Sequence, residues 1–562
     1  MSHPRSTAAR RVETPGETSP LLPQPEENNI FSNTSGFSTP QDVTAKAAPV
    51  NEYMAGVKLW LLVTAITLGT SLVLLDMSII ATAIPQITTE FHTLADVGWY
   101  GSSYLLASSA LQPLTGKLYA RFNIKYTFLC FFALFEAGSC LCGFAPTSYI
   151  FIAGRSVSGL GAAGIVNGAY TIVAAAVPME KRPALIGIIM MVGQVGMVGG
   201  PILGGLLTSY ASWRWCFLIN IPLGAIVVAF LGAIDIPEVF AGRVNSNIKV
   251  NLLSTVLSLD PVGFLLFTAF SIMFLLGLQG AERSSALGLF LGAAATFAIF
   301  GVWEYVAKEN AMFPYSMLRK RVVWSSCVVI LLFQGCALVY SFFVPIYFQA
   351  SKGAAPVWSG LYNSPGIGSQ MIVAGVSSAL VGKWGYYLPW SISSAILVIL
   401  GSCLMSTLNQ RSSAPQWVGY QIIAGIGRGC GATMPMVAVQ NILPLEQIPL
   451  GMSLISFCQT FGGTLSLSVA QNIFTCSLRE GLARFAPTVD VEKVLNAGAT
   501  GFRDVVQPSD VFAVTRAFDM SLRRIFYLAA ALSLGCFTFV WGMGWHSVKA
   551  KRESRRDPAP EA

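Results

Sequence analysis

Long apolar runs, separated by short polar segments, fill the chain from about residue 59 to residue 545. A helix needs about 20 consecutive apolar residues to cross the hydrocarbon core of a bilayer. Fourteen runs come close to this length or exceed it, at 59–84, 98–118, 126–144, 149–177, 184–210, 215–236, 259–278, 286–306, 323–348, 357–381, 389–408, 417–439, 452–474 and 526–545. A count of twelve would discard two of the strongest runs. The pattern therefore predicts an all-α polytopic membrane protein with 14 transmembrane helices.

The composition indicates that lipid surrounds most of the chain. Hydrophobic residues make up 54% of the 562 residues and charged residues 11%, whereas a soluble domain carries about 25% charged residues. The net charge of +8 does not indicate nucleic-acid binding, because the basic residues fall in short loops and in the C-terminal tail. By the positive-inside rule, these loops predict that both termini face the cytoplasm. The expected partner is the lipid bilayer and not nucleic acid.

The same pattern divides the chain into five parts. Residues 1–58 are rich in Ser, Thr, Pro, Glu and Asn and predict a disordered cytoplasmic tail, in which 17–22 match an acidic dileucine sorting signal. We predict an N-terminal six-helix half at 59–236 and a C-terminal one at 323–545. The C-terminal half includes a long outer loop at 477–524. The other two parts are two inserted helices with flanking loops at 237–322 and a basic cytoplasmic tail at 546–562.

The two predicted halves resemble each other in one glycine-rich segment. Residues 155–164, in the fourth predicted helix, have a weaker counterpart at 425–431 in the twelfth. The counterparts come into register if the seventh and eighth helices are an insertion between the halves. Internal repeats of this kind are typical of transporters.

Four charged residues stand out inside the predicted membrane helices, where each costs several kcal/mol and needs a reason. Asp76 lies about 12 Å below the outer end of its helix and Arg155 about 10 Å below the outer end of its own, so the two are expected to be partners. An ion pair that only fixes helix packing and a proton or substrate site both fit this placement. Glu136 falls near mid-membrane, where it either takes part in proton coupling or faces a polar pocket without function. Arg428 is the fourth.

Histidine is not expected to carry protons in the membrane. The three histidines lie in the tail, in a loop and at a helix end, at His3, His92 and His546. Proton coupling would therefore use carboxylates, whose proton affinity responds to burial and to a neighbouring arginine. Asp76 beside Arg155 is an arrangement in which substrate and proton could compete for one site.

Glycines line one face of the fifth predicted helix. Gly193, Gly196, Gly200 and Gly204 share that face, which lets another helix backbone approach closely. Pro201 bends the helix. A proline among so many glycines, which include Gly205, lowers the stability of the helix, and tight packing alone does not require this loss. We favour a moving interface over simple tight packing. Polar residues with a candidate place in a substrate cavity are Arg428, Gln459 and Gln471.

The sequence does not indicate an enzyme, a metal site or a cofactor. It contains no Gly-x4-Gly-Lys-Ser/Thr run, which disfavours an ATP-driven pump. It shows neither a cluster of histidines and carboxylates nor a nucleophile elbow in a suitable context.

Ordered motifs in the first half resemble the major facilitator superfamily, and specifically its fourteen-spanner drug:proton antiporter family. The matching segments are 75–85, 99–106, 116–125, 155–164, 196–205 and 213–222. The loop motif departs from the family pattern, since Ala120, Asn123 and Ile124 replace its Asp, Gly and one basic residue. Its remaining candidate cytoplasmic-gate residues are Gly116, Arg121 and Lys125.

The likeness extends to fungal pumps that export mycotoxins and other secondary metabolites, through 116–119, 159–165, 178–183 and 345–350. It implies a monomeric proton-coupled efflux transporter, of the multidrug-resistance type, for a small hydrophobic metabolite, toxin or drug. It also implies two six-helix halves that rock about a central cavity, with Asp76 for coupling, Arg155 for tuning its protonation and the glycines of the fifth helix at the interface between halves. The expected location is the cell membrane.

Two alternatives stay open at this point. A vacuolar carrier, or a siderophore or amino-acid carrier of the same fold, would lie in the vacuole membrane, and the dileucine match supports it. A non-transporting receptor or sensor belongs to a different class, which the helix count and the glycine motif disfavour.

Overall fold

The computed structural model describes residues 53–92, 96–237, 259–278 and 283–549. The chain divides into two units, Met1–Val50 and Asn51–Ala562, and the described residues belong to the second. The dileucine match and most of the predicted tail at 1–58 lie outside the described residues, as do 238–258 and 550–562. The described part is helical, and its β-bridge between Tyr386 and Ser547 is an isolated one.

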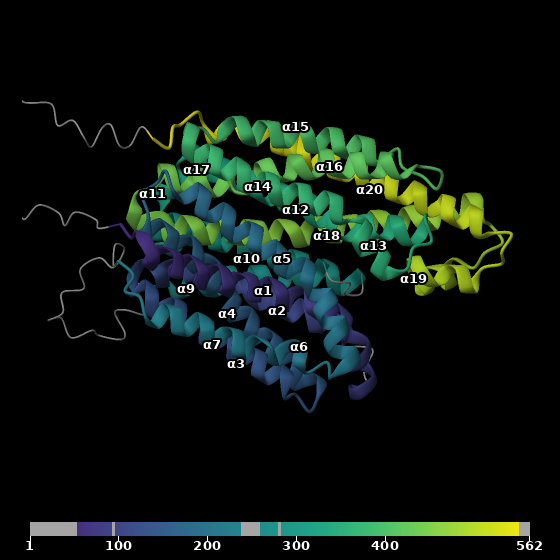
Figure 1. Ribbon diagram of the computed structural model, residues 1–562, viewed down its shortest axis with the longest axis horizontal. Helices are drawn as coiled ribbons and strands as arrows, with labels where there is room; N and C mark the ends of the chain where they lie inside the picture. The colour runs from purple at the N-terminus through teal and green to yellow at the C-terminus, as the bar shows by residue number, and fades with distance from the viewer. Residues whose placement is uncertain (1–52, 93–95, 238–258, 279–282, 550–562) are drawn as a thin grey trace, which may run out of the picture. The chain divides into compact units, whose positions relative to one another are not determined.

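The helices before the predicted insertion form a first set that packs together (Figure 1). They are α1 (Gly56–Phe91), α2 (Val97–Arg121), α3 (Ile124–Gly143), α4 (Ser148–Ala176), α5 (Arg182–Tyr210), α6 (Trp215–Leu218) and α7 (Asn220–Gly232). Helices α3 and α4 lie against each other, as do α1 and α5, and α2 and α4. Asn123, which departs from the family's loop motif, caps α3 by accepting a hydrogen bond from the amide of Tyr126 at 3.1 Å.

The helices after the insertion form a second set with similar neighbours. They are α12 (Arg321–Ala350), α13 (Pro356–Tyr362), α14 (Ser364–Trp384), α15 (Leu388–Met405), α16 (Ala414–Gly431), α17 (Met434–Ile442), α18 (Ile448–Phe485), α19 (Val491–Val505) and α20 (Val511–Val540). Helix α16 packs on α14 and α15, and α12 packs on α18 and α20. The segment predicted as a long outer loop is helical, because α18, α19 and α20 extend through it.

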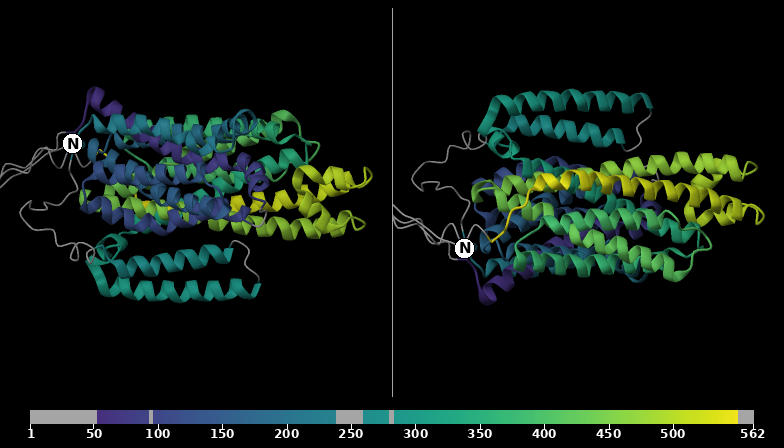
Figure 2. Two further views of the ribbon diagram at one scale, coloured as in Figure 1. Left: turned by 90° about the horizontal axis from the view of Figure 1, so that it is seen from below. Right: turned by 90° about the horizontal axis from the view of Figure 1, so that it is seen from above.

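In the sequence, the two sets are separated by α9 (Pro261–Leu278), α10 (Arg283–Ala307), a 3-10 turn (Lys308–Asn310) and α11 (Tyr315–Leu318). Figure 2 shows α9 and α10 as a hairpin along one side of the bundle. Phenylalanines fill the space beneath it: the ring of Phe267 lies 4.6 Å from that of Phe457 in α18, and Phe274 lies 5.0 Å from Phe461. Because α9 also packs on α2, the hairpin contacts one helix of each set.

Twelve helical spans in the described residues are long and apolar enough to cross a membrane, so the predicted count of fourteen is not confirmed. The two predicted spans that are not among them, at 98–118 and 452–474, correspond to α2 and α18. These two helices pack on each other, and the contacts between membrane helices accept small and polar residues that a lipid-facing surface does not. Their position explains why their composition is the less apolar.

The glycine face of α5 generates a test of this packing. A Cβ built on Gly196 would lie 2.6 Å from the carbonyl oxygen of Ser71 in α1, whereas a Cβ on Gly199 would meet nothing within 4 Å. We expect Gly196→Ala to destabilise the purified protein by about 1–3 kcal/mol. Gly199→Ala, three residues away, should change stability by no more than about 1 kcal/mol, in the stabilising direction. Thermal unfolding in detergent measures both, and equal effects would contradict the packing described.

Candidate functional site

A buried ion pair joins α1 to α4. Nη1 of Arg155 lies 2.6 Å from Oδ2 of Asp76, and the two side chains are 1% and 0% exposed. The similar depths of Asp76 and Arg155, estimated from the sequence, thus correspond to a direct contact between the two side chains. Two charges removed from water in this way are stable only while they remain paired, since either one alone would be an uncompensated buried charge.

Aromatic residues and one backbone carbonyl hold Arg155 in place. Its Nε donates to the carbonyl oxygen of Tyr100 at 3.0 Å. Its guanidinium lies 4.5 Å from the ring centre of Tyr104 and 5.8 Å from that of Phe217, within the range of cation–π attraction. The orientation of Arg155 is therefore fixed from three sides besides Asp76.

The carboxylate of Asp76 is only partly satisfied. Its Oδ1 is buried without a hydrogen-bond partner among the described residues, and so is the hydroxyl of Tyr104. A carboxylate with one oxygen on arginine and one unoccupied can accept a proton on the second oxygen. Protonation would cancel the negative charge and release the guanidinium from its strongest contact.

Glu136 lies on α3 outside this pair. Both of its carboxylate oxygens are buried without a hydrogen-bond partner in the described residues, and they point to Gly224 of α7, where a Cβ would collide with Oε1. The structure therefore does not bring Glu136 into contact with Asp76 or Arg155. It is a second buried carboxyl group in the same set of helices.

The glycine face of α5 packs on α1. Built Cβ atoms would lie 2.8 Å from Leu74 at Gly193 and 3.0 Å from the backbone of Ile79 at both Gly200 and Gly204. The shared face is thus as predicted, but α1 belongs to the same predicted half, so this contact does not join the halves. Pro201 lies inside the continuous helix, and Gly205 meets nothing within 4 Å. This glycine face, here also called the glycine seam, places α5 beside α1, the helix that holds Asp76.

The two sets of helices meet near the end of the bundle that contains Met54 and Ser547, here called the terminal end. A Cβ on Gly116 of α2 would lie 2.9 Å from the backbone of Leu450 in α18, and one on Gly187 of α5 would lie 2.6 Å from Ser378 in α14. The amide of Gln440 donates to the carbonyl of Tyr170 at 3.5 Å. Small residues let the helices approach closely there.

The predicted gate residues have different surroundings. Gly116 is in the contact between α2 and α18. Lys125 instead donates to the carbonyl of Ile234 at 2.7 Å and lies 3.8 Å from the exposed Asp235, which ties α3 to the end of α7. Arg121 is exposed at the end of α2.

The opposite end of the bundle, here called the far end, contains α13 and α19 (Figure 1). Some glycines near this end of α2, α5, α13 and α14 have no neighbour within 4 Å of a built Cβ atom, namely Gly98, Gly101, Gly205, Gly360 and Gly368, whereas Gly204 and Gly366 do have neighbours. At this end of the first set, Glu90 accepts a hydrogen bond from Nε1 of Trp213 at 2.6 Å and pairs with Arg214 at 2.9 Å. The hydrogen bond from Trp213, assisted by Arg214, lowers the pKa of Glu90 in spite of its partial burial.

Arg428 is a buried cation in the second set, on α16. It is 6% exposed, and no hydrogen bond or ion pair to it is found in the described residues; its Nε is buried and unsatisfied. The guanidinium lies 4.7 Å from the ring centre of Tyr340. Cation–π attraction of about 1–2 kcal/mol is smaller than the several kcal/mol that burial of an ion costs, so Arg428 is not fully compensated.

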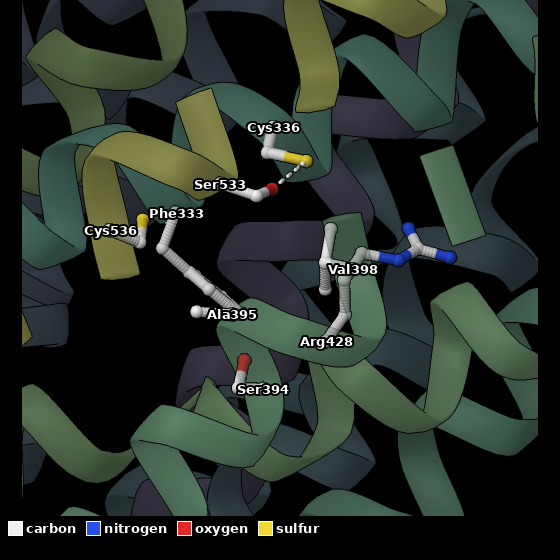
Figure 3. A pocket seen from close by; sticks show the side chains of 8 residues that line it. All are labelled: Phe333, Cys336, Ser394, Ala395, Val398, Arg428, Ser533 and Cys536. Atoms are coloured by element: carbon white, nitrogen blue, oxygen red, sulfur yellow. Dashed lines mark hydrogen bonds between the residues drawn. The ribbon is translucent and has the colours of Figure 1, made fainter. Parts of the chain in front are cut away.

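The stem of Arg428 borders a small cavity that also has Phe333, Cys336, Ser394, Ala395, Val398, Ser533 and Cys536 in its wall (Figure 3). The volume open to water is about 10 Å³, about that of one water molecule. Of the other predicted cavity residues, Gln459 donates to Gln334 of α12 at 3.3 Å and Gln471 is exposed. The structure does not bring these three residues together.

Sequence reasoning did not single out a cluster beneath the inserted helices. Lys117 donates to the carbonyl of Asn310 at 2.9 Å, and Glu304 accepts from the amides of Met312 and Phe313 at 3.0 and 3.2 Å. The signals were present, because Lys117 is part of the loop motif and Glu304 is a carboxylate within a predicted span. The cluster fastens the insertion to α2.

The ion pair can be tested by removing one partner at a time. Arg155→Met leaves Asp76 buried and unpaired, so we expect the purified protein to lose about 3–5 kcal/mol of stability. Asp76→Asn added to the same chain should recover most of this loss, because no buried charge is left. Arg214→Gln, in the exposed pair with Glu90, should cost no more than about 1 kcal/mol. Additive effects of the two buried substitutions in thermal unfolding would contradict a direct interaction.

A sequence model of the family called the Major Facilitator Superfamily matches residues 66–467 of the chain. The efflux pump mlcE of Penicillium citrinum is 46% identical over 97% of this chain and 100% of its own length. The MFS-type transporter pigP of Monascus ruber is 47% identical over 90% of each chain, and the efflux pump mokI of Monascus pilosus is 46% identical over 92% of this chain and 96% of its own.

Among solved structures, the proton:xylose symporter XylE has a TM-score of 0.58 at 12% identity, over 88% of this chain and 98% of that one. At this identity the likeness concerns the fold alone. With a family match over most of the chain and relatives similar along nearly their whole length, the protein belongs to the major facilitator superfamily, as a multi-pass membrane transporter and not an enzyme.

Proposed function

We propose that the protein is a proton-coupled efflux pump for a small hydrophobic secondary metabolite, toxin or drug. The names of the relatives that match it from end to end support efflux, since two of those described above are called efflux pumps. The observation that supports proton coupling is the buried pair of Asp76 and Arg155, in which one carboxylate oxygen is unoccupied. The fungal organisms of these relatives support a fungal metabolite as the substrate.

Fourteen helices cross the membrane in this proposal. Helices α2 and α18 join the twelve apolar spans, because both are long enough, at 25 and 38 residues, and their contact with each other accounts for their weaker hydropathy. The halves are 59–236 and 323–545, with α9 and α10 as the insertion. The bridging position of α9 between α2 and α18 supports an insertion that accompanies the movement of the halves.

The arrangement of contacts corresponds to an outward-open state. If both termini face the cytoplasm, as the basic loops predict, the terminal end is the closed cytoplasmic side and the far end is the open outer side. Gly116 and Gly187 then belong to the closed cytoplasmic gate. The location is the cell membrane, where a pump in this orientation would move its substrate out of the cell.

Coupling would proceed through Asp76. A proton that enters from the outer side binds the unoccupied oxygen of Asp76, and the ion pair with Arg155 loses its attraction. The released guanidinium and the neutral carboxyl group favour a rearrangement of α1 against α4, and the glycine seam passes this movement to α5. Glu136 offers a second protonation site on α3. Return to the outward-open state requires Asp76 to lose its proton to the cytoplasm.

Asp76→Asn tests the coupling role. The amide keeps the size of the side chain but leaves Arg155 without its opposite charge, so export is compared at equal amounts of folded protein in the membrane. At equal amounts we expect the variant to lose at least about 90% of uphill export, because an amide cannot take up and release a proton. The measurement is export of hydrophobic fluorescent compounds and fungal metabolites from cells, with and without a protonophore. Glu90→Gln, which changes a carboxylate outside the apolar span of α1, serves as the matched control and should export normally. Normal uphill export by Asp76→Asn would exclude this residue from coupling.

A reversible crosslink tests the gate. Gly187→Cys with Ser378→Cys places two thiols at the contact of α5 with α14, in a background where the exposed Cys130, Cys403 and Cys476 are serine. We expect oxidation to join them and to lower transport at least about tenfold, since alternating access requires this contact to open. Reduction should restore it. Full transport by the oxidised protein would show that the contact does not separate during the cycle.

A further inference from the structure

Arg428 is not the repeat counterpart of Arg155, although both are buried arginines in helices that correspond. In α4, built Cβ atoms on Gly159 and Gly161 meet the backbone of Tyr104 and of Phe135; in α16, those on Gly425 and Gly427 meet the backbone of Gly366 and of Val398. The two glycine pairs therefore occupy matching places in the two sets of helices.

When the two glycine pairs are aligned, the residue of α16 that corresponds to Arg155 is Gln421. The residue of α4 that corresponds to Arg428 is Ala162. The contacts agree with this register, since Arg155 donates to the carbonyl of Tyr100 and Gln421 to that of Tyr362. The fold thus accommodates an alanine where the second set has a buried guanidinium. The packing of the repeat does not account for Arg428.

The guanidinium of Arg428 faces a small polar site, here called the α16 site. Figure 3 shows that it extends away from the cavity walled by Ser394, Ser533 and the cysteines. A Cβ built on Gly366 would lie 3.4 Å from both Nη2 of Arg428 and Oε1 of Gln421. The ring of Tyr340 covers the guanidinium, and Oε1 of Gln421 is buried without a partner in the part of the chain that the structure describes.

We propose that the α16 site binds an anionic group, a carboxylate in the first place, on the transported molecule. Arginine presents paired N–H groups that match a carboxylate, and a buried guanidinium lacking such a partner is arranged to receive one. Gly366 leaves room beside Nη2, and Tyr340 offers an aromatic face to an adjoining apolar part. The substrate class is therefore a hydrophobic organic acid. This inference rests on the proposed export function and specifies its substrate.

Matched acid and amide probes test the α16 site in the full-length purified protein. The pairs are 1-pyrenebutyrate with 1-pyrenebutyramide, 2-naphthoate with 2-naphthamide and decanoate with decanamide, and ligand-induced thermal stabilisation measures the binding. We expect at least one acid to bind the wild-type protein about tenfold more tightly than its amide, because only the acid can pair with Arg428. Arg428→Met should abolish this preference and Arg428→Lys should keep part of it.

Two further variants separate recognition from folding. Gly366→Val keeps the charge but places methyl groups beside Nη2, so it should also abolish the preference for the acid. Arg411→Gln removes a charge from an exposed loop residue and should leave the preference intact. If Arg428→Met does not fold, Arg428→Lys and Gly366→Val still decide the question.

The outcomes distinguish this inference from the proposed function. A protein that exports neutral compounds in a protonophore-sensitive way, but binds no acid of the panel more tightly than its amide, overturns the α16 site and leaves the efflux function standing. A preference for the acid that survives both Arg428→Met and Gly366→Val also overturns the site. A protein without any protonophore-sensitive export, of acids or of amides, overturns the efflux function and the inference with it.

Discussion

The ion pair between Asp76 and Arg155 is the constraint on which the first set of helices depends. Two opposite charges can remain inside a membrane bundle only if the helices that hold them stay in register. Glycine makes this possible: Gly159 lets α4 approach the backbone of α2, so that Arg155 reaches the carbonyl of Tyr100. The glycine seam of α5 then fixes α1 from the other side. The ion pair thus joins α1 to α4, with α2 and α5 packed on either side of it.

The contacts between the two sets of helices lie close to the helices that surround this ion pair. They join α2 to α18 and α5 to α14. Gly116 and Gly187 form close contacts of these two pairs near the terminal end, whereas Gly98 and Gly205, nearer the far end, have no neighbour within 4 Å of a built Cβ. The helices that meet across this boundary include α5, which also packs on the helix of Asp76. A change in the charge of Asp76 therefore has a short physical route to the boundary. The inserted hairpin spans the same boundary through its phenylalanines.

Much of the fold followed from apolar run lengths, and the pairing of Asp76 with Arg155 followed from counting residues to a common depth. The glycine periodicity predicted the packing face of α5, but periodicity does not name the partner, which is α1 and not a helix of the other half. The apolar runs did not predict the helical extension of α18 to α20, because helices outside the bilayer are polar and contain no such runs. Composition could not show that Arg428 lacks a carboxylate partner, since this depends on contacts between distant helices.

In the proposed cycle, Asp76 gives up one proton when the substrate binds. Proton release on substrate binding tests it most directly, measured with a pH indicator in weakly buffered solution on the purified protein and a compound that it exports. We expect the wild-type protein to release protons when the substrate binds, and Asp76→Asn to release about one proton fewer per molecule. Equal release from the two proteins would contradict it.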